Sequence, residues 1–141
     1  METVWHKQLI FDSVFSKEVI ADFEDGRIPL DAGGLLLRDL DHRYRLTDKA
    51  ARCLHDPLDS RKVKHDLLPL VRQRLFALAQ GYEDNNNAAT LARDPALKIM
   101  ASKAPESAAD LASQPSLSRF ENMVPAKDLR RFSDWLVEIY L

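Results

Sequence analysis

The chain has 141 residues, of which 45% are hydrophobic and 30% are charged, a balance typical of one folded domain with a hydrophobic core. The net charge of −2 excludes a surface that is cationic throughout, and the single cysteine, Cys53, excludes an internal disulfide bond or a site built from several thiolates. No apolar run approaches about 18 residues and the N-terminus has no signal-peptide pattern, so we expect a cytoplasmic protein without a membrane partner.

Charge is unevenly distributed along the chain. Residues 1–37 carry three basic and seven acidic side chains, whereas residues 38–74 carry ten basic and six acidic ones. A basic middle segment is compatible with phosphate contact, although a solvated helix surface is the commoner explanation of such a pattern.

The N-terminal part predicts an arm followed by a β-hairpin. Residues 18–23 and 27–30 flank Asp25-Gly26, a dipeptide that favours a hairpin turn between two strands. We therefore divide the chain into an arm and hairpin at 1–32 and a helical domain at 33–141, packed as one compact unit. The hairpin itself is expected at about 18–30. A metal site is an alternative interpretation of four nearby carboxylates, but turns and edge strands are the commoner place for them: Asp22, Glu24, Asp25 and Asp31.

The middle of the chain predicts three helices. Gly33-Gly34 is expected in a loop, a first helix follows at 35–44, and Thr47 is expected to cap a second. The longest periodic segment covers 60–80, but Pro69 predicts a bend in it or a break near Asp66. The basic side chains of this segment are candidate phosphate contacts: Arg61, Lys62, Lys64, Arg72 and Arg74.

The last third predicts four more helices. Asp94-Pro95 should open a short one, residues 105–111 a second, Ser113 and Pro115 a third, and Pro125 the last. In the third, Leu117 and Phe120 fall on one buried stripe. The remaining surface presents polar side chains suited to base edges and phosphates in a major groove: Gln114, Ser116, Ser118, Arg119 and Asn122.

The Leu-Ser-Arg sequence at 117–119 resembles the recognition helix of bacterial helix-turn-helix repressors, which suggests such a motif at about 106–123. On residue types alone, an ordinary amphipathic helix with a polar outside is the commoner interpretation. The basic side chains Lys127 and Arg131 near the start of the final helix are further phosphate candidates, because an anion there would relieve their opposition to the helix dipole.

Catalytic patterns are missing from the sequence. The four histidines have no zinc-site spacing, and no serine lies in a nucleophile elbow. No glycine-rich nucleotide loop occurs either. We predict no catalytic residue, metal ligand or cofactor in this chain.

Six segments together resemble the N-terminal region of bacterial insertion-sequence transposases of the DDE-domain group 1 type. They occur in the family's order, over about residues 18–141: FEDGRI at 23–28, GGLLLR at 33–38, LVRQRLF at 70–76, GYED at 81–84, RDP at 93–95 and SQPSLSRFEN at 113–122. Pro69 and the Asn85-Asn86-Asn87 run depart from the family's pattern. The resemblance implies an RNase H-like catalytic domain in full-length relatives, where three carboxylates hold two divalent metals such as Mg²⁺.

In that family the first catalytic Asp follows the region represented here, so we expect this chain to lack the catalytic carboxylates. The resemblance implies a bacterial, nucleoid-associated region that binds transposon ends and helps to assemble the transposition complex. Two alternatives stay open: a module for dimerisation or for docking on the catalytic domain, which as a lone fragment could inhibit the full-length enzyme, and a nuclease using the acidic N-terminal segment.

Overall fold

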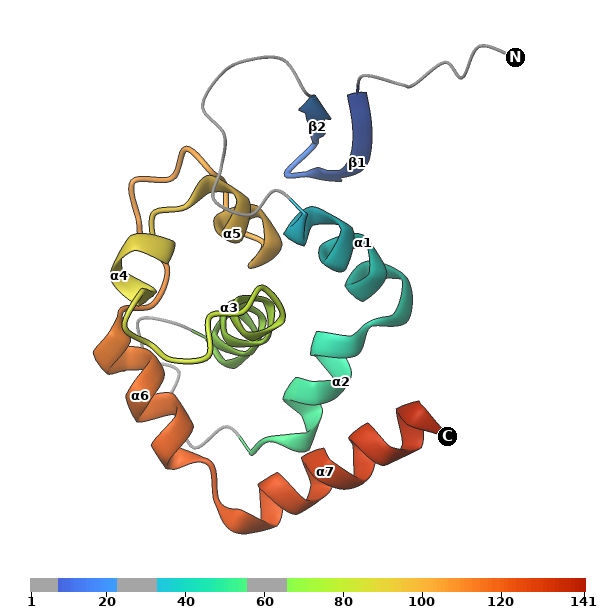
Figure 1. The fold of residues 1–141 in the computed structure, drawn as a ribbon, viewed down its shortest axis with the longest axis vertical. Coiled ribbons are helices and arrows are strands. Elements are labelled where there is room, and N and C mark those ends of the chain that lie inside the picture. Colours follow the sequence, from blue (N-terminus) through green and yellow to red (C-terminus); the bar gives the residue numbers. More distant parts are fainter. Residues whose placement is uncertain (1–7, 23–32, 56–65) are drawn as a thin grey trace.

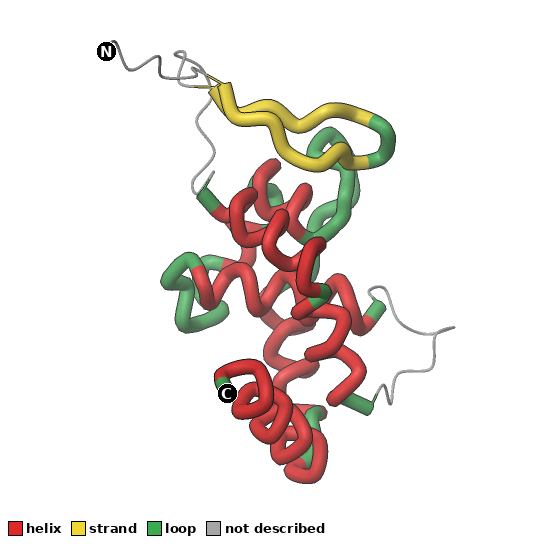
Figure 2. Tube along the Cα trace, turned by 90° about the vertical axis from the view of Figure 1, so that its right-hand side faces the viewer, coloured by secondary structure: helices red, strands yellow, loops and turns green. Residues whose placement is uncertain are grey.

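The computed structural model describes residues 8–22, 33–55 and 66–141. These residues form a two-stranded antiparallel hairpin and seven helices, which confirms the mainly helical class with an N-terminal hairpin. In Figure 1, α3 lies near the centre and the other helices surround it; the hairpin and α7 lie at opposite ends of the molecule in Figure 2. The elements are β1 (Gln8–Val14), β2 (Lys17–Asp22), α1 (Gly34–Tyr44), α2 (Leu46–Cys53), α3 (Leu67–Ala79), α4 (Ala88–Leu91), α5 (Pro95–Met100), α6 (Gln114–Met123) and α7 (Ala126–Tyr140).

The hairpin begins earlier in the chain than we expected, at residue 8 instead of about 18. Phe11 pairs with Val19, and the strands are joined by Phe15-Ser16, whose φ angles are 49° and 64°. Two consecutive positive φ angles suit a two-residue hairpin turn, but Asn-Gly or Asp-Gly usually supplies them. The expected second strand at 27–30 lies outside the described residues.

Apolar side chains from the hairpin and four helical segments meet in one core. Phe11 of β1 packs in the same cluster as Leu35 of α1, Phe76 of α3 and Leu97 of α5. Gly34 is the first residue of α1 rather than part of a loop, and its backbone lies close to other residues of the core. A Cβ built on Gly34 would lie 2.4 Å from Sδ of Met100, which leaves room only for glycine unless that side chain shifts.

The junction between α1 and α2 shows that the prediction of Thr47 as the cap of α2 was wrong. Arg45 has a φ of 54° and connects the two helices directly. Thr47 is the second residue of α2, not its cap, and its backbone N–H donates to Oδ1 of Asp41 at 2.6 Å. The acceptor for this unpaired helical N–H therefore comes from the preceding helix.

Helix α3 begins after Asp66, as Pro69 predicted. Pro69 is its third residue, a position whose backbone N–H has no partner within the helix in any case. The expected helical segment before Asp66 falls largely within residues 56–65, outside the described residues.

The first helix of the expected helix-turn-helix motif does not form. Residues 101–113 are turns and extended backbone between α5 and α6. A turn bond joins the N–H of Ser107 to the carbonyl of Ala104 at 3.0 Å, and the segment is also held by residues outside it. Nζ of the buried Lys98 donates to the carbonyl of Ser107 at 2.9 Å, and the N–H of Leu111 donates to the carbonyl of Ala92 at 3.0 Å. Thus α6 is present without the partner helix that such a motif requires.

Candidate nucleic-acid interface

Helix α6 has one packed face and one open face. Leu117 is buried, in a cluster with Leu70 of α3 and Ala88 of α4, and Phe120 packs against the same cluster. Among the sequence-predicted contact residues, Gln114, Arg119 and Asn122 are exposed, whereas Ser116 and Ser118 are half-buried. Because α-helical residues advance by about 100°, Ser118, Arg119 and Asn122 share the side opposite Leu117.

Polar contacts within α6 leave most of the open face available. Nε of Arg119 donates to the carbonyl of Pro115 at 3.1 Å, and its terminal nitrogens bind no other described residue. Ser113 is the N-cap residue, as predicted, but its hydroxyl lies 3.2 Å from that of Ser116 instead of binding a backbone N–H. The guanidinium of Arg119 is therefore positioned by its own helix, and the side chain is exposed.

A buried amide fixes the start of α6. Gln73 of α3 is 2% exposed; its Nε2 donates to the carbonyl of Ala112, and its Oε1 accepts from the N–H of Ala112, both at 2.9 Å. This pair satisfies both backbone groups of a residue just before α6. Sequence reasoning missed Gln73, because nothing local to position 73 indicates a partner almost forty residues away.

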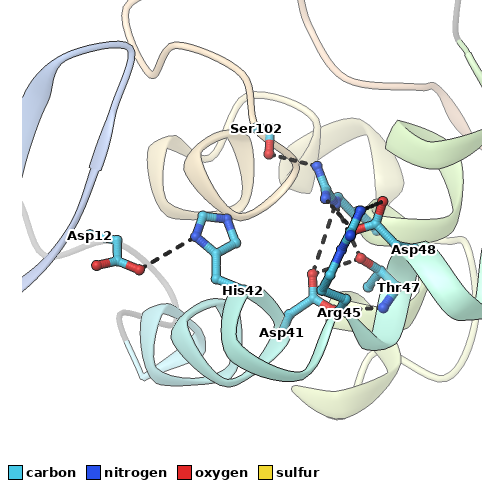
Figure 3. Close-up of polar contacts among 8 residues, drawn as sticks. Asp12, Asp41, His42, Arg45, Thr47, Asp48 and Ser102 are labelled. Atoms are coloured by element: carbon cyan, nitrogen blue, oxygen red, sulfur yellow. Dashed lines mark hydrogen bonds and ion pairs between the residues drawn. The ribbon is translucent and has the colours of Figure 1, made fainter.

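Arg72, a predicted phosphate contact, is engaged inside the protein. Its side chain is 14% exposed, with Nη1 donating to Oγ of Ser102 at 2.8 Å and Nε donating to Oγ1 of Thr47 at 3.1 Å. Asp48 and Asp41 complete its surroundings, 3.5 Å and 3.9 Å from its nitrogens. Figure 3 shows the labelled members of this network converging between α1, α2 and the end of α5. The network fastens α2 to α3, a role that the sequence alone did not indicate.

Arg74, the other described phosphate candidate on α3, is also occupied. Its Nε donates to Glu121 of α6, while its terminal nitrogens donate to the carbonyls of Tyr82 and Glu83 at 3.1 Å and 2.7 Å. Glu121 also accepts from Asn85 at 2.9 Å. These contacts connect α6 to α3 and to the loop between α3 and α4. The remaining candidates of this segment, Arg61, Lys62 and Lys64, lie outside the described residues.

The start of α7 combines an exposed lysine with a buried carboxylate. Lys127 is exposed, and Arg131 donates to Asp128, which is fully buried. The backbone N–H of His55, just after α2, donates to Oδ2 of Asp128 at 2.7 Å. This bond, aided by Arg131 and Lys127 against the opposing effect of burial, holds the pKa of Asp128 below its usual value. Lys127 makes no ion pair with any residue that the structure describes, whereas Arg131 is partly committed to Asp128.

The described residues contain no group of three or more histidine, cysteine, aspartate or glutamate side chains placed to hold a metal ion. None of the helices that the structure describes is long and apolar enough to span a membrane.

Comparison with known families confirms the resemblance seen in the sequence. The model of the family Transposase DDE domain group 1 matches residues 11–141, which is nearly the whole chain. Neither a curated protein nor a solved structure matches the chain. Because the match covers most of the hairpin and all seven described helices, it does not depend on one short motif. The chain belongs to the Transposase DDE domain group 1 family.

Proposed function

We propose that this region binds transposon-end DNA during transposition of an insertion sequence, with α6 in the major groove. The single observation that carries the proposal is the open face of α6, where Ser118, Arg119 and Asn122 point away from a packed Leu117. Arginine can bond guanine bidentately and asparagine can do so with adenine, so this face has the chemistry for base recognition. Gln114 and Ser116 flank it.

The supports of α6 favour the same function. The Gln73–Ala112 pair and the Arg74–Glu121 contact hold the helix at its start and along one side. A recognition helix that is already rigid loses less conformational freedom when it binds. Lys127 and Arg131, which follow α6 in the chain, are the phosphate contacts that we retain. Arg72 and Arg74 are internal anchors in this account.

The test begins with selection from a random-sequence DNA duplex library, followed by anisotropy measurements on the enriched duplex. Arg119→Ala should weaken binding by about 1–3 kcal/mol and relax the preference at one base position. Lys17→Ala is the matched control, since Lys17 is an exposed cation on the hairpin that pairs with Glu106. A library that yields no enriched sequence, or equal losses for both variants, would contradict the proposal.

A second candidate, self-association through α7, is favoured by a different observation. Leu129, Leu136 and Tyr140 are 55%, 48% and 94% exposed. Together with Ser133 they follow the alternating four- and three-residue spacing of a helix–helix seam. An antiparallel second copy would bring the basic start of one α7, with Lys127 and Arg130, toward the acidic end of the other, with Asp134 and Glu138.

Light scattering on the purified chain tests this candidate. A dimer that Leu136→Glu dissociates, while Leu36→Glu does not, would support it; Leu36 is a suitable control because it is equally apolar and 56% exposed on α1. A monomer at every concentration would exclude it. DNA binding that persists in that monomer would leave the first proposal intact.

A further inference from the structure

The exposed side of α2 carries a row of cations that the proposed α6 contact does not use. Arg45, Lys49 and Arg52 are all exposed. Lys49 and Arg52 are three residues apart on α2, so they fall within about 60° of one another around the helix, and Arg45 is the N-cap residue four positions before Lys49. The row extends along the helix for about 10.5 Å. Sequence reasoning missed it because the stronger run of basic residues lies further along the chain, at 61–74.

Acidic and basic side chains around α2 lie on different sides of the helix. Asp41 is 3% exposed and binds Thr47, and Asp48 turns toward Arg72 of α3. Lys49 and Arg52 make no ion pair with any residue in the described ranges, and Arg45 reaches only Asp48, at 3.8 Å. Asp48 of α2 and Asp41 of α1 are thus bound to partners on the side of α2 that faces α3. The outer face keeps positive charge although the chain as a whole has a net charge of −2.

Helix α2 holds this row rigidly. Thr47 and Ala50 are buried on its opposite side, and the helix packs against both α3 and α7. Two internal networks fasten its ends: Asp41 and Arg72 bind near its start, and Asp128 of α7 accepts the N–H of His55 just after its end. A row of cations on a fixed helix can meet a regular array of phosphates without first becoming ordered.

We propose that the outer face of α2 is a second DNA contact, in which Arg45, Lys49 and Arg52 bind consecutive phosphates of a duplex. The phosphates of one strand advance by about 3.4 Å along the duplex axis, so the length of the row covers about three such steps, a run of about four phosphates. The inference extends the proposed DNA binding to another surface. In Figure 1, α3 lies between α2 and α6, so this surface is separate from the open face of α6. Phosphate contacts carry no base preference, and the two surfaces therefore have different expected signatures.

The main experiment measures binding of a short random-sequence duplex as a function of salt. The double variant Lys49→Gln/Arg52→Gln should bind at least about tenfold more weakly in moderate salt, and the slope of log K against log salt should fall by about 2. Lys17→Gln/Arg93→Gln is the control, because it removes the same charge from exposed cations that are paired with Glu106 and Asp110. Equal slopes for the two double variants would overturn the inference.

A measurement without substitutions checks the same surface. Acetylation of lysines in the folded chain, followed by mass spectrometry, should show Lys49 protected by the duplex and Lys17 unprotected. Labelling of Lys49 that DNA does not change would count against the inference even if the double variant failed to fold.

The outcomes also separate this inference from the proposed function. A wild-type chain that binds no duplex at low salt contradicts both. If Arg119→Ala relaxes base preference while the α2 variant matches its control in affinity and slope, only the α2 contact is wrong. If the α2 variant loses affinity and salt dependence while no base preference exists, only the role of α6 is wrong.

Discussion

Asp41 accepts two hydrogen bonds from Thr47, one from its backbone N–H to Oδ1 and one from its hydroxyl to Oδ2, both 2.6 Å long. Both residues are 3% exposed. The same hydroxyl accepts from Nε of Arg72, so the pair also links α1 and α2 to α3 (Figure 3). The buried carboxylate of Asp41 thereby caps α2 and orients Thr47. It also lies near Arg72, which contacts residues from three segments of the chain.

Replacing this carboxylate should destabilise the whole domain. Asp41→Ala leaves the N–H and hydroxyl of Thr47 buried without their acceptor, and we expect a loss of about 1–3 kcal/mol in the free energy of unfolding. Urea denaturation followed by circular dichroism measures it. Asp134→Ala on the exposed side of α7 is the control and should change stability by less than about 0.5 kcal/mol. Equal effects of the two substitutions would show that the Asp41–Thr47 pair does not stabilise the fold.

Gln73 provides a second test, of how α6 is positioned. Gln73→Leu replaces the amide by an apolar side chain of similar size and leaves both backbone groups of Ala112 buried without partners, at a cost of about 2–4 kcal/mol. The substitution should increase the rate of amide hydrogen exchange more in α6 than in α1, because the lost contact adjoins the start of α6. The exposed Thr90→Val serves as the control. Unchanged exchange in α6 would mean that packing of Leu117 alone positions the helix.

Arg38 is expected to secure the hairpin. It is 3% exposed, and its terminal nitrogens donate to the carbonyls of Asp12 and Ser13 in β1, at 2.9 Å and 3.4 Å. Burial lowers the pKa of Arg38 from its ordinary value, against the opposing influence of Asp39 and Asp12.

Lysine can preserve the charge but not this forked geometry, so Arg38→Lys should cost about 1–3 kcal/mol and speed amide exchange in β1. Arg43→Lys, on the exposed side of the same helix, should do neither. Similar exchange of β1 in both variants would be the contrary result. Exchange in α7, at the far end of the molecule, reports whether any effect is local.

The stability of the domain should depend on pH through Asp128. Its pKa is lowered from an ordinary value of 3.8, first by the N–H of His55 and then by Arg131 and Lys127, despite burial. A depressed carboxyl pKa contributes stability above the unfolded-state pKa. That contribution declines as the pH falls below about 3.8 and is gone below the lowered folded-state pKa.

Asp128→Asn should therefore be less stable than the wild type at neutral pH, and the difference should shrink in acid. Free energies of unfolding measured from neutral pH to about pH 2 give the comparison, with the exposed Asp134→Asn as control. A constant difference between wild type and Asp128→Asn across this range would rule out a titrating contribution from Asp128.

Local signals in the sequence were sufficient to predict much of the fold. Pro69 marks the start of α3, Asp94 accepts from the N–H of Leu97 at 2.8 Å as an N-cap, and Ser113 with Pro115 marks α6. Each prediction depends on the chemistry of residues within one helical turn. The turn at Phe15-Ser16 was not predicted because neither residue is the glycine, asparagine or aspartate that usually supplies positive φ angles in a hairpin, although both have them. The predicted Asp25-Gly26 turn lies outside the described residues.

The candidate interface was less predictable, because charge along a sequence does not reveal which cations are paired. Arg72 and Arg74 look like free basic residues until Ser102 and Glu121 are brought beside them from distant segments. The sequence does not reveal that Lys49 and Arg52 are unpaired among the described residues, because it does not show that the nearby acidic side chains bind other partners. The outward direction of Arg119, by contrast, follows from its position relative to Leu117 and Phe120, which sequence periodicity identifies.

The central claim, that the open face of α6 contacts DNA, is tested most directly by mapping backbone amide chemical shifts while the enriched duplex is added. We expect the largest changes within residues 114–123, with Arg119 and Asn122 among them, and little change at Leu136 of α7. A duplex that binds while the α6 amides keep their shifts would contradict the account.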